Sequence, residues 1–331
     1  MLNDKLTLFV SNTQDLKGSF TWSGGPLVKR MAALLYALEG RRIDVEAIRR
    51  CYDMIKRNAG IFSYFRGTMA ICLSALLALT SDPDAVFDDT LNVYDMLKKE
   101  GFWGSEFLVV AAYEIARQAE ASDYKTVAGR SRAFYDGMKK NRFFITGYDD
   151  YIYAAMLGLS DLDVEVGVER VEIFNSRLRR EFSNKNSVQT LAQTLALSSP
   201  DGDAVDRVLA LRDAFRASGV RMDRLFTLSS LGVLALLPAE PGEIAGKVAQ
   251  AKDMLRAQRG FGVMTLTTQA LLLYAAALVT DEYMQNIRDG LLTATLSTSI
   301  TNIIISQQTT MVAILAASQA ASSSASSSHS G

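Results

Sequence analysis

The chain repeats one short phrase at nearly even intervals, and this repeat constrains the fold more than any other feature. The phrase joins an aromatic residue, an Asp or Asn and usually a methionine, followed by basic residues and a glycine-aromatic step. Its acidic or amide position falls at Asp53, Asp95, Asp136, Asn175, Asp213 and Asp253, in steps of 38 to 42 residues. A period of this size is typical of repeat proteins, in which each unit packs on its neighbours.

Each copy predicts two helices. The first carries basic residues in its last turn and ends near a glycine such as Gly101, because glycine accepts the left-handed conformation that closes a helix. The second is more apolar and rich in small residues, which predicts a helix buried on both sides. The second helices are predicted over residues 65–79, 106–116, 149–159, 188–197, 225–237 and 266–279.

These patterns predict an all-α fold of helical-hairpin repeats. We expect about seven two-helix units of ~40 residues, forming an α-solenoid or a closed α/α toroid. Trp22 and Pro26–Leu38 indicate an incomplete first unit, and residues 281–296 and 298–317 indicate a terminal pair. We assign residues 1–318 to a single helical-repeat domain. Residues 319–331 are almost wholly Ser and Ala, which predicts a disordered tail.

Composition excludes several kinds of chemistry. The single histidine, His329, lies in the predicted tail, which leaves no histidine for Ser-His-Asp or Cys-His catalysis or for His-ligated metals. No Walker loop or Rossmann fingerprint occurs, so we expect no cofactor and no metal. The 35 basic and 36 acidic side chains leave a net charge of −1, which argues against a nucleic-acid partner.

The location is expected to be the cytoplasm. Cys51 and Cys72 fall in helical patterns and are expected to be buried thiols. The start of the sequence lacks the pattern of a secretory signal. The longest apolar stretches are shorter than the roughly 18 residues that span a bilayer, so we expect no membrane segment.

Polar side chains gather where the second helix of each unit begins. In a regular stack, equivalent positions line up along one edge, so these side chains are expected to form one rim. The candidate ligand- or partner-binding residues on this rim are Arg66, Glu106, Thr146, Tyr148, Asp149, Asp150, Gln189 and Arg224. Helix capping explains the same residue types, because Thr146-x-x-Asp149 resembles a capping box. Asn186-x-x-Gln189 has the same spacing, and both interpretations stay open.

The densest part of this rim is residues 143–151, where two adjacent carboxylates lie among four aromatic residues. Adjacent helical residues do not share a face, so Asp149 and Asp150 bind one ion only if the loop bends. A carboxylate pair with Glu106 from the neighbouring unit is another possibility. Gln189, Gln193 and Gln269 lie within second helices, where their amides either are satisfied in the core or line a channel.

Three phrases carry a family resemblance: residues 60–67, residues 94–98 and residues 144–150. Through them the stretch from Trp22 to about Leu237 resembles an uncharacterised bacterial family catalogued as domain of unknown function 4003. The resemblance implies a soluble bacterial protein and supplies no activity. The first helices also resemble, more loosely, pentatricopeptide hairpins, although the unit here is longer and the balanced charge argues against an RNA groove.

Two functions follow as hypotheses. The first is a helical-repeat scaffold that binds a protein or peptide partner, because the repeat offers a long surface and no catalytic constellation is evident. The alternative is an α/α-toroid enzyme or small-molecule binder that uses carboxylates and tyrosines at the rim. An open arc favours the scaffold. A closed ring favours the enzyme if four rim side chains converge on a deep pocket: Glu106, Asp149, Asp150 and Gln189.

Overall fold

The computed structural model describes residues 2–20, 25–60, 63–67, 70–141, 146–198, 203–285 and 305. Within these ranges all regular structure is helical, with 14 α-helices, one short 3-10 helix and no strand. The odd-numbered helices are α1 (Leu2–Asp15), α3 (Val45–Asn58), α5 (Pro83–Lys99), α7 (Tyr124–Asn141), α9 (Val164–Leu178), α11 (Asp203–Ala217) and α13 (Pro241–Arg256). The even-numbered helices are α2 (Pro26–Leu38), α4 (Ala70–Ala78), α6 (Glu106–Gln118), α8 (Asp150–Leu159), α10 (Lys185–Ser198), α12 (Ser230–Ala235) and α14 (Thr268–Met284), and the 3-10 helix η1 (Tyr64–Arg66) precedes α4.

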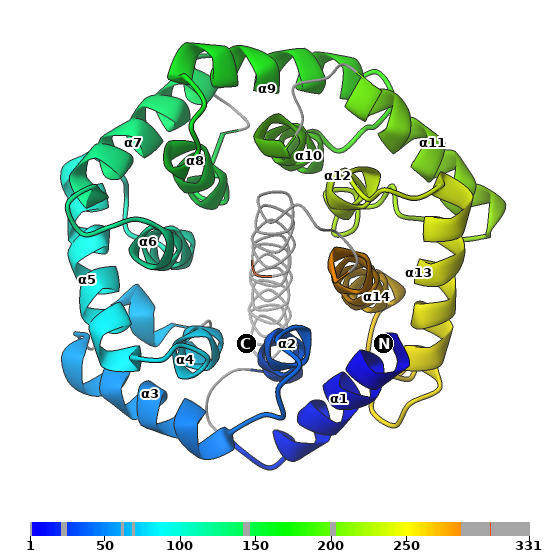
Figure 1. The fold of residues 1–331 in the computed structure, drawn as a ribbon, viewed down its shortest axis with the longest axis horizontal. Helices are drawn as coiled ribbons and strands as arrows, with labels where there is room; N and C mark the ends of the chain where they lie inside the picture. The colour runs from blue at the N-terminus through cyan, green and yellow to red at the C-terminus, as the bar shows by residue number, and fades with distance from the viewer. Residues whose placement is uncertain are drawn as a thin grey trace, which may run out of the picture.

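The helices pack in neighbouring pairs and form two layers (Figure 1). The odd-numbered helices lie on the outside, across the line of view, and the even-numbered helices lie inside and are seen end-on. The two ends of the described helical series also meet, because α1 contacts both α13 and α14, and α2 contacts α14. The edge-to-face contact of Phe9 with Phe261, with ring centroids 5.2 Å apart, lies at this junction.

Local sequence explains where the helices begin and end. Asp44, Asp82 and Ser105 cap α3, α5 and α6 by accepting a hydrogen bond from a backbone N–H three residues on. Glycines follow the outer helices α5, α11 and α13 with positive φ, as the sequence predicts: Gly101 at 93°, Gly219 at 70° and Gly260 at 89°. Glycine adopts this left-handed conformation at the end of a helix without steric cost, because it has no Cβ.

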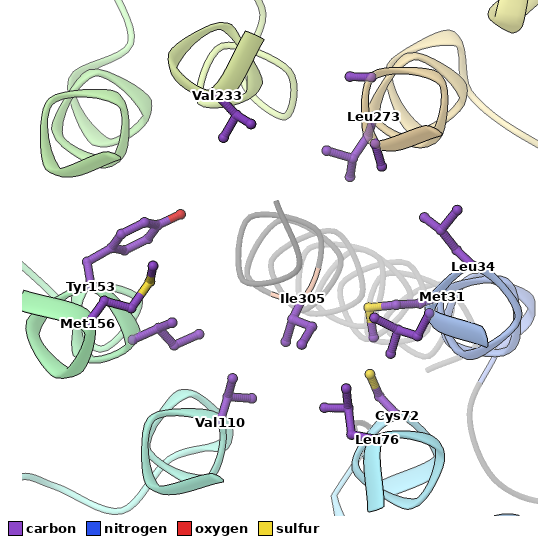
Figure 2. Packing of buried hydrophobic residues seen from close by; sticks show 14 of the residues in the cluster. Met31, Leu34, Cys72, Leu76, Val110, Tyr153, Met156, Val233, Leu273 and Ile305 are labelled. Atoms are coloured by element: carbon purple, nitrogen blue, oxygen red, sulfur yellow. The ribbon is translucent and has the colours of Figure 1, made fainter. Parts of the chain in front are cut away.

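The inner helices surround an apolar centre (Figure 2). Ile305 lies there and is fully buried. The side chains that face it come from α2, α4, α6, α8, α12 and α14, and include Met31, Leu76, Val110, Met156, Val233 and Leu273. The large apolar area removed from water at this centre stabilises the arrangement of the inner layer.

Several sequence-based boundaries are wrong. The first unit is not incomplete, because Leu2–Asp15 forms a full helix, α1, that packs on α2. The inner helix α14 runs through residue 281, where a new helix was expected to begin. The inner helix α12 covers only Ser230–Ala235, since residues 224–230 form successive turns. Except for Ile305, residues 286–331, with the expected terminal pair and tail, lie outside the described residues.

Candidate functional site

The connections that lead from an outer helix into an inner helix form the candidate site, and we call this surface the rim. Contacts between these connections place the starts of neighbouring inner helices together. The backbone N–H of Trp103, before α6, donates to the Tyr151 hydroxyl of α8 at 3.3 Å. The backbone N–H of Phe226, before α12, donates to Oε1 of Gln269 in α14 at 3.2 Å. The starts of α6 and α8 therefore lie side by side, as do those of α12 and α14.

A buried polar cluster, which we call the Asp150 cluster, joins α8 to α10 at this edge. Oδ1 of Asp150 accepts hydrogen bonds from Nε2 of Gln189 at 2.9 Å and from Nε2 of Gln193 at 2.7 Å. Its Oδ2 accepts from the backbone N–H of Gly147 at 2.8 Å. Nε2 of Gln189 also lies 3.2 Å from Oγ1 of Thr146. Three of the sequence-predicted residues, Thr146, Asp150 and Gln189, are thus brought together.

Burial dominates the electrostatics of the Asp150 cluster. Asp150 is only 3% exposed, and loss of hydration is the largest cause that raises the pKa of its carboxyl. The neighbouring carboxylate of Asp149 raises this pKa further, whereas the bonds from Gly147, Gln193 and Gln189 lower it. The pKa of Asp149 is also raised by burial. Together these effects raise the pKa of the Asp150 carboxyl to about 7 inside a hydrogen-bonded core.

The structure contradicts the capping interpretation of two predicted rim residues. The cap of α10 is Asn184, whose Oδ1 accepts from the backbone N–H of Ser187 at 2.9 Å. The side chain of Gln189 donates a hydrogen bond to Asp150 on the neighbouring helix α8 instead of taking part in the cap. At α8, the residue before the first turn is Asp149, and its side chain makes no capping bond. For Gln193 the sequence leaves open a satisfied core amide or a channel-lining amide; it lies one turn after Gln189 on the same face, and its buried Nε2 donates to Asp150.

Exposed aromatic side chains lie on three consecutive connections of the rim, and we call them the aromatic rim. They are Tyr64, Trp103 and Tyr148, which are 49%, 72% and 51% exposed. The Tyr64 ring packs over Gly104, where an added Cβ would lie 2.9 Å from it. Tyr148 contacts Tyr151, with ring centroids 5.5 Å apart. These contacts link the three exposed rings through neighbouring hairpins.

The other predicted rim residues do not converge on Asp150. Glu106 reaches back to Gly67, where its Oε1 would lie 2.2 Å from an added Cβ, while Asp150 faces α10. The two carboxylates thus point to opposite neighbours and form no catalytic pair. Arg66 is half-buried in η1, and Arg224 is exposed before α12.

Two further observations bear on the chemistry of the site. Among the described residues, no group of three or more His, Cys, Asp or Glu side chains could hold a metal ion. None of the helices within the described ranges is long and apolar enough to cross a membrane. The cytoplasmic location stays a prediction.

Fold and rim together define an all-helical protein of paired helices whose inner-helix starts carry an aromatic and polar edge. The chain belongs to the family described as "Protein of unknown function (DUF4003)", whose model matches residues 12–309. This match extends beyond both ends of the stretch that carries the resemblance in the sequence.

One curated relative is the "Uncharacterized protein YeaA" of Bacillus subtilis (strain 168). It is 22% identical over 205 residues, which cover 60% of this chain and 61% of that protein. No solved structure matches the chain.

Proposed function

We propose that the protein is a closed α/α toroid of repeated hairpins that binds an acidic peptide segment of a partner protein along the aromatic rim. The observation that carries the proposal is the exposure of Tyr64, Trp103 and Tyr148 on three consecutive connections. Large aromatic side chains are usually buried, and Trp and Tyr dominate the binding energy of protein interfaces.

Ring closure is supported by contacts between the two ends of the described helices. Nε2 of Gln14 donates to the carbonyl of Arg259 at 2.8 Å, and the Lys5 ammonium lies 3.1 Å from the Asp281 carboxylate. An open solenoid would leave its terminal units uncovered, whereas here α1 and α14 cover one another.

The charge beside the aromatic rim favours an acidic partner. The last turn of α5 carries Lys98 and Lys99, and the last turn of α7 carries Lys139 and Lys140. These turns lead directly into the connections that hold Trp103 and Tyr148. A peptide with apolar and acidic side chains would place the former on the rings and the latter beside the lysines.

The enzyme alternative has less support. The Asp150 carboxyl is buried and already accepts three hydrogen bonds, so it has no open approach for a substrate. Glu106 points away from it toward Gly67, and the side chains labelled around the centre in Figure 2 are apolar apart from the Tyr153 hydroxyl. A catalytic pocket of this kind normally combines an accessible cavity with convergent polar groups.

The test uses Trp103 as both binding group and reporter. The sequence has two tryptophans, so Trp22→Phe leaves Trp103 as the only indole. Peptides selected from a random displayed library on the wild-type protein are expected to be rich in Asp and Glu. Titration of a selected peptide should shift the Trp103 emission to shorter wavelength, because the indole leaves water on binding.

Matched variants separate the rim from other exposed apolar surface. Tyr64→Ser combined with Tyr148→Ser should weaken peptide binding at least about tenfold, since each ring is a candidate hot spot. Val166 and Ile173 are 50% and 52% exposed on the outer helix α9, and Val166→Ser with Ile173→Ser should leave binding unchanged. Equal loss in both pairs, selection of peptides without acidic residues, or tighter binding of a single-stranded oligonucleotide would each contradict the proposal.

A further inference from the structure

A pocket lies where the first hairpin meets the last. Its volume is about 480 Å³, and its described walls come from residues 13–17, 25–30, 259–260 and 265. We call it the seam pocket. It opens beside the start of α2 and the connection from α13 to α14, where the first described hairpin packs on the last. A volume of this size suits a small organic molecule rather than a bare ion.

Arg30 is the central group of the seam pocket. It is only 7% exposed, and its guanidinium stacks on Phe261 at 5.6 Å from the ring centroid. Nη2 donates to the carbonyl of Gly260 at 2.7 Å. Nε and Nη1 are buried and have no acceptor among the described residues. Buried guanidinium groups ordinarily have a carboxylate or another anion beside them, because an unpaired buried charge is costly.

The rest of the wall adds positive charge without a balancing carboxylate. Lys17, Lys29 and Arg259 line the pocket, and no Asp or Glu is among its described lining residues. Burial lowers the pKa of Arg30, and Tyr274 is the neighbouring group that partly offsets this effect. Lys29 donates to the carbonyl of Ser19, which holds its ammonium at the wall.

The start of α2 also favours an anion at this place. Gly25 and Pro26 line the pocket, and Gly25 is the N-cap residue, which has no side chain to cap the helix. The first turn of a 13-residue helix carries the positive end of the helix dipole. The positive end of this dipole adds to the positive electrostatic potential of the four cationic side chains that line the pocket.

We propose that the seam pocket binds a small molecule through an anionic phosphate or carboxylate group that accepts hydrogen bonds from Arg30. This site goes beyond the peptide surface of the proposed function and does not depend on it. Because the walls come from both ends of the helical series, the bound molecule would join the first hairpin to the last. Ligand binding is therefore expected to stabilise ring closure as well as to fill the pocket.

The experiment measures binding and thermal stability with defined probes. Inorganic pyrophosphate and citrate are titrated by calorimetry at constant ionic strength, with sodium chloride as the control salt. At least one probe is expected to bind and to raise the melting temperature, and the two probes distinguish a phosphate from a carboxylate ligand. Hydrogen exchange of residues 9–16 and 259–266 should slow with the binding probe, because these segments form the walls.

Variants test whether Arg30 and its neighbours carry the binding. Arg30→Met should abolish binding, while the ligand-free protein should be at least as stable as wild type, because the substitution removes an unpaired buried charge. Lys17 and Arg259 are exposed, so Lys17→Gln with Arg259→Gln should fold normally and weaken binding at least about threefold. Arg49→Gln is the control, since this exposed residue pairs with Glu46 and is not among the described residues that line the pocket.

Three results would overturn the proposal. One is the absence of saturable binding of either probe. Another is equal weakening in Arg49→Gln and in the exposed pocket pair, which would indicate general charge attraction. The third is unchanged binding in both pocket variants. None of these depends on the aromatic rim, so the peptide proposal would still stand or fall by its own test.

Discussion

Nε2 of Gln193 lies 2.7 Å from Oδ1 of Asp150, and this hydrogen bond joins the inner helix α10 to its neighbour α8. Both side chains are buried where α8 packs against α10. Because the pKa of Asp150 is raised to about 7 in the folded protein, we expect this joint between two hairpins to respond to pH within the physiological range.

The first prediction concerns this pH dependence. The folded pKa of Asp150, about 7, is above its unfolded value of 3.8. Between these values the folded protein holds a proton that the unfolded chain has lost, so the Asp150 contribution to stability falls as pH rises from 4 to 7. The Asp150→Asn substitution removes this loss of stability at higher pH, because an amide does not ionise. Relative to wild type, the variant should gain on the order of 1 to 3 kcal/mol between pH 4.5 and pH 8.

Denaturant unfolding at several pH values checks this change. The pKa of the buried Glu114 is also raised to about 7, so a pH-dependent loss should remain in Asp150→Asn. Glu114→Gln should remove a further part of this loss, and the carboxyls of Asp149 and Asp281, whose pKa values are also raised by burial, account for the rest. Parallel pH profiles for Asp150→Asn and wild type would show that the folded carboxyl is ionised throughout, and would refute the prediction.

The second prediction concerns the close packing of an inner helix on an outer one. Gly158 in α8 is buried against α7, and an added Cβ would lie 2.3 Å from Oγ and 2.9 Å from the backbone nitrogen of Ser131. Gly158→Ala should therefore cost about 2 to 4 kcal/mol, because backbone must move. Gly246 in α13 is exposed with no atom within 4 Å of an added Cβ, and Gly246→Ala should stabilise by up to about 1 kcal/mol. Chemical denaturation measures both, and a loss in Gly246→Ala would contradict the argument.

The third prediction concerns an arginine that closes an inner helix. The Arg207 guanidinium donates to the carbonyls of Ala235, Leu237 and Ala239 at 2.7, 2.7 and 3.0 Å. Arg207→Met leaves these carbonyls without their charged donor and should cost about 2 to 4 kcal/mol in the free energy of unfolding. Arg49→Met removes an exposed ion pair and should cost less than about 1 kcal/mol. Similar losses in the two variants would show that the three carbonyl bonds contribute little.

The fourth prediction concerns the apolar centre. Ile305 is fully buried among side chains of the inner helices (Figure 2). Ile305→Ala should leave a cavity and cost about 2 to 4 kcal/mol, and Ile305→Val should cost about 1 kcal/mol. Thermal unfolding of the two variants gives the comparison. Two variants with wild-type stability would mean that the packing around Ile305 does not contribute to folding in solution.

Much of the fold follows from local pattern. The step of 38 to 42 residues predicts paired helices, and the residues at Asp53, Asp95 and Asp136 all fall in outer helices. The inner helices were found because they are apolar on all sides, and α6 and α8 begin within one residue of their predicted starts. The first outer helix, α1, was missed because it lacks the repeated phrase and only its contact with α2 reveals its role.

The candidate site was predictable in part. The rim was identified because equivalent positions of a repeat share an edge, which brought Thr146, Asp150 and Gln189 into one prediction. Sequence spacing did not show which of these residues cap helices. Asn186-x-x-Gln189 has the spacing of a capping box, yet the residue that caps α10 is Asn184. Trp103 is exposed, although buried aromatic residues lie beside it. The sequence alone does not show this difference in exposure.

By itself, the sequence determined the helical class, the period and the edge on which polar residues collect, because these depend on neighbours within a few turns or one unit. The tertiary structure alone decided which side chains meet across units. Arg30 and Gly260 are 230 positions apart, and Gln14 and Arg259 are 245 apart. A periodic pattern carries no information on such pairs, because they arise only where the first hairpin packs on the last and takes a charged side chain out of water.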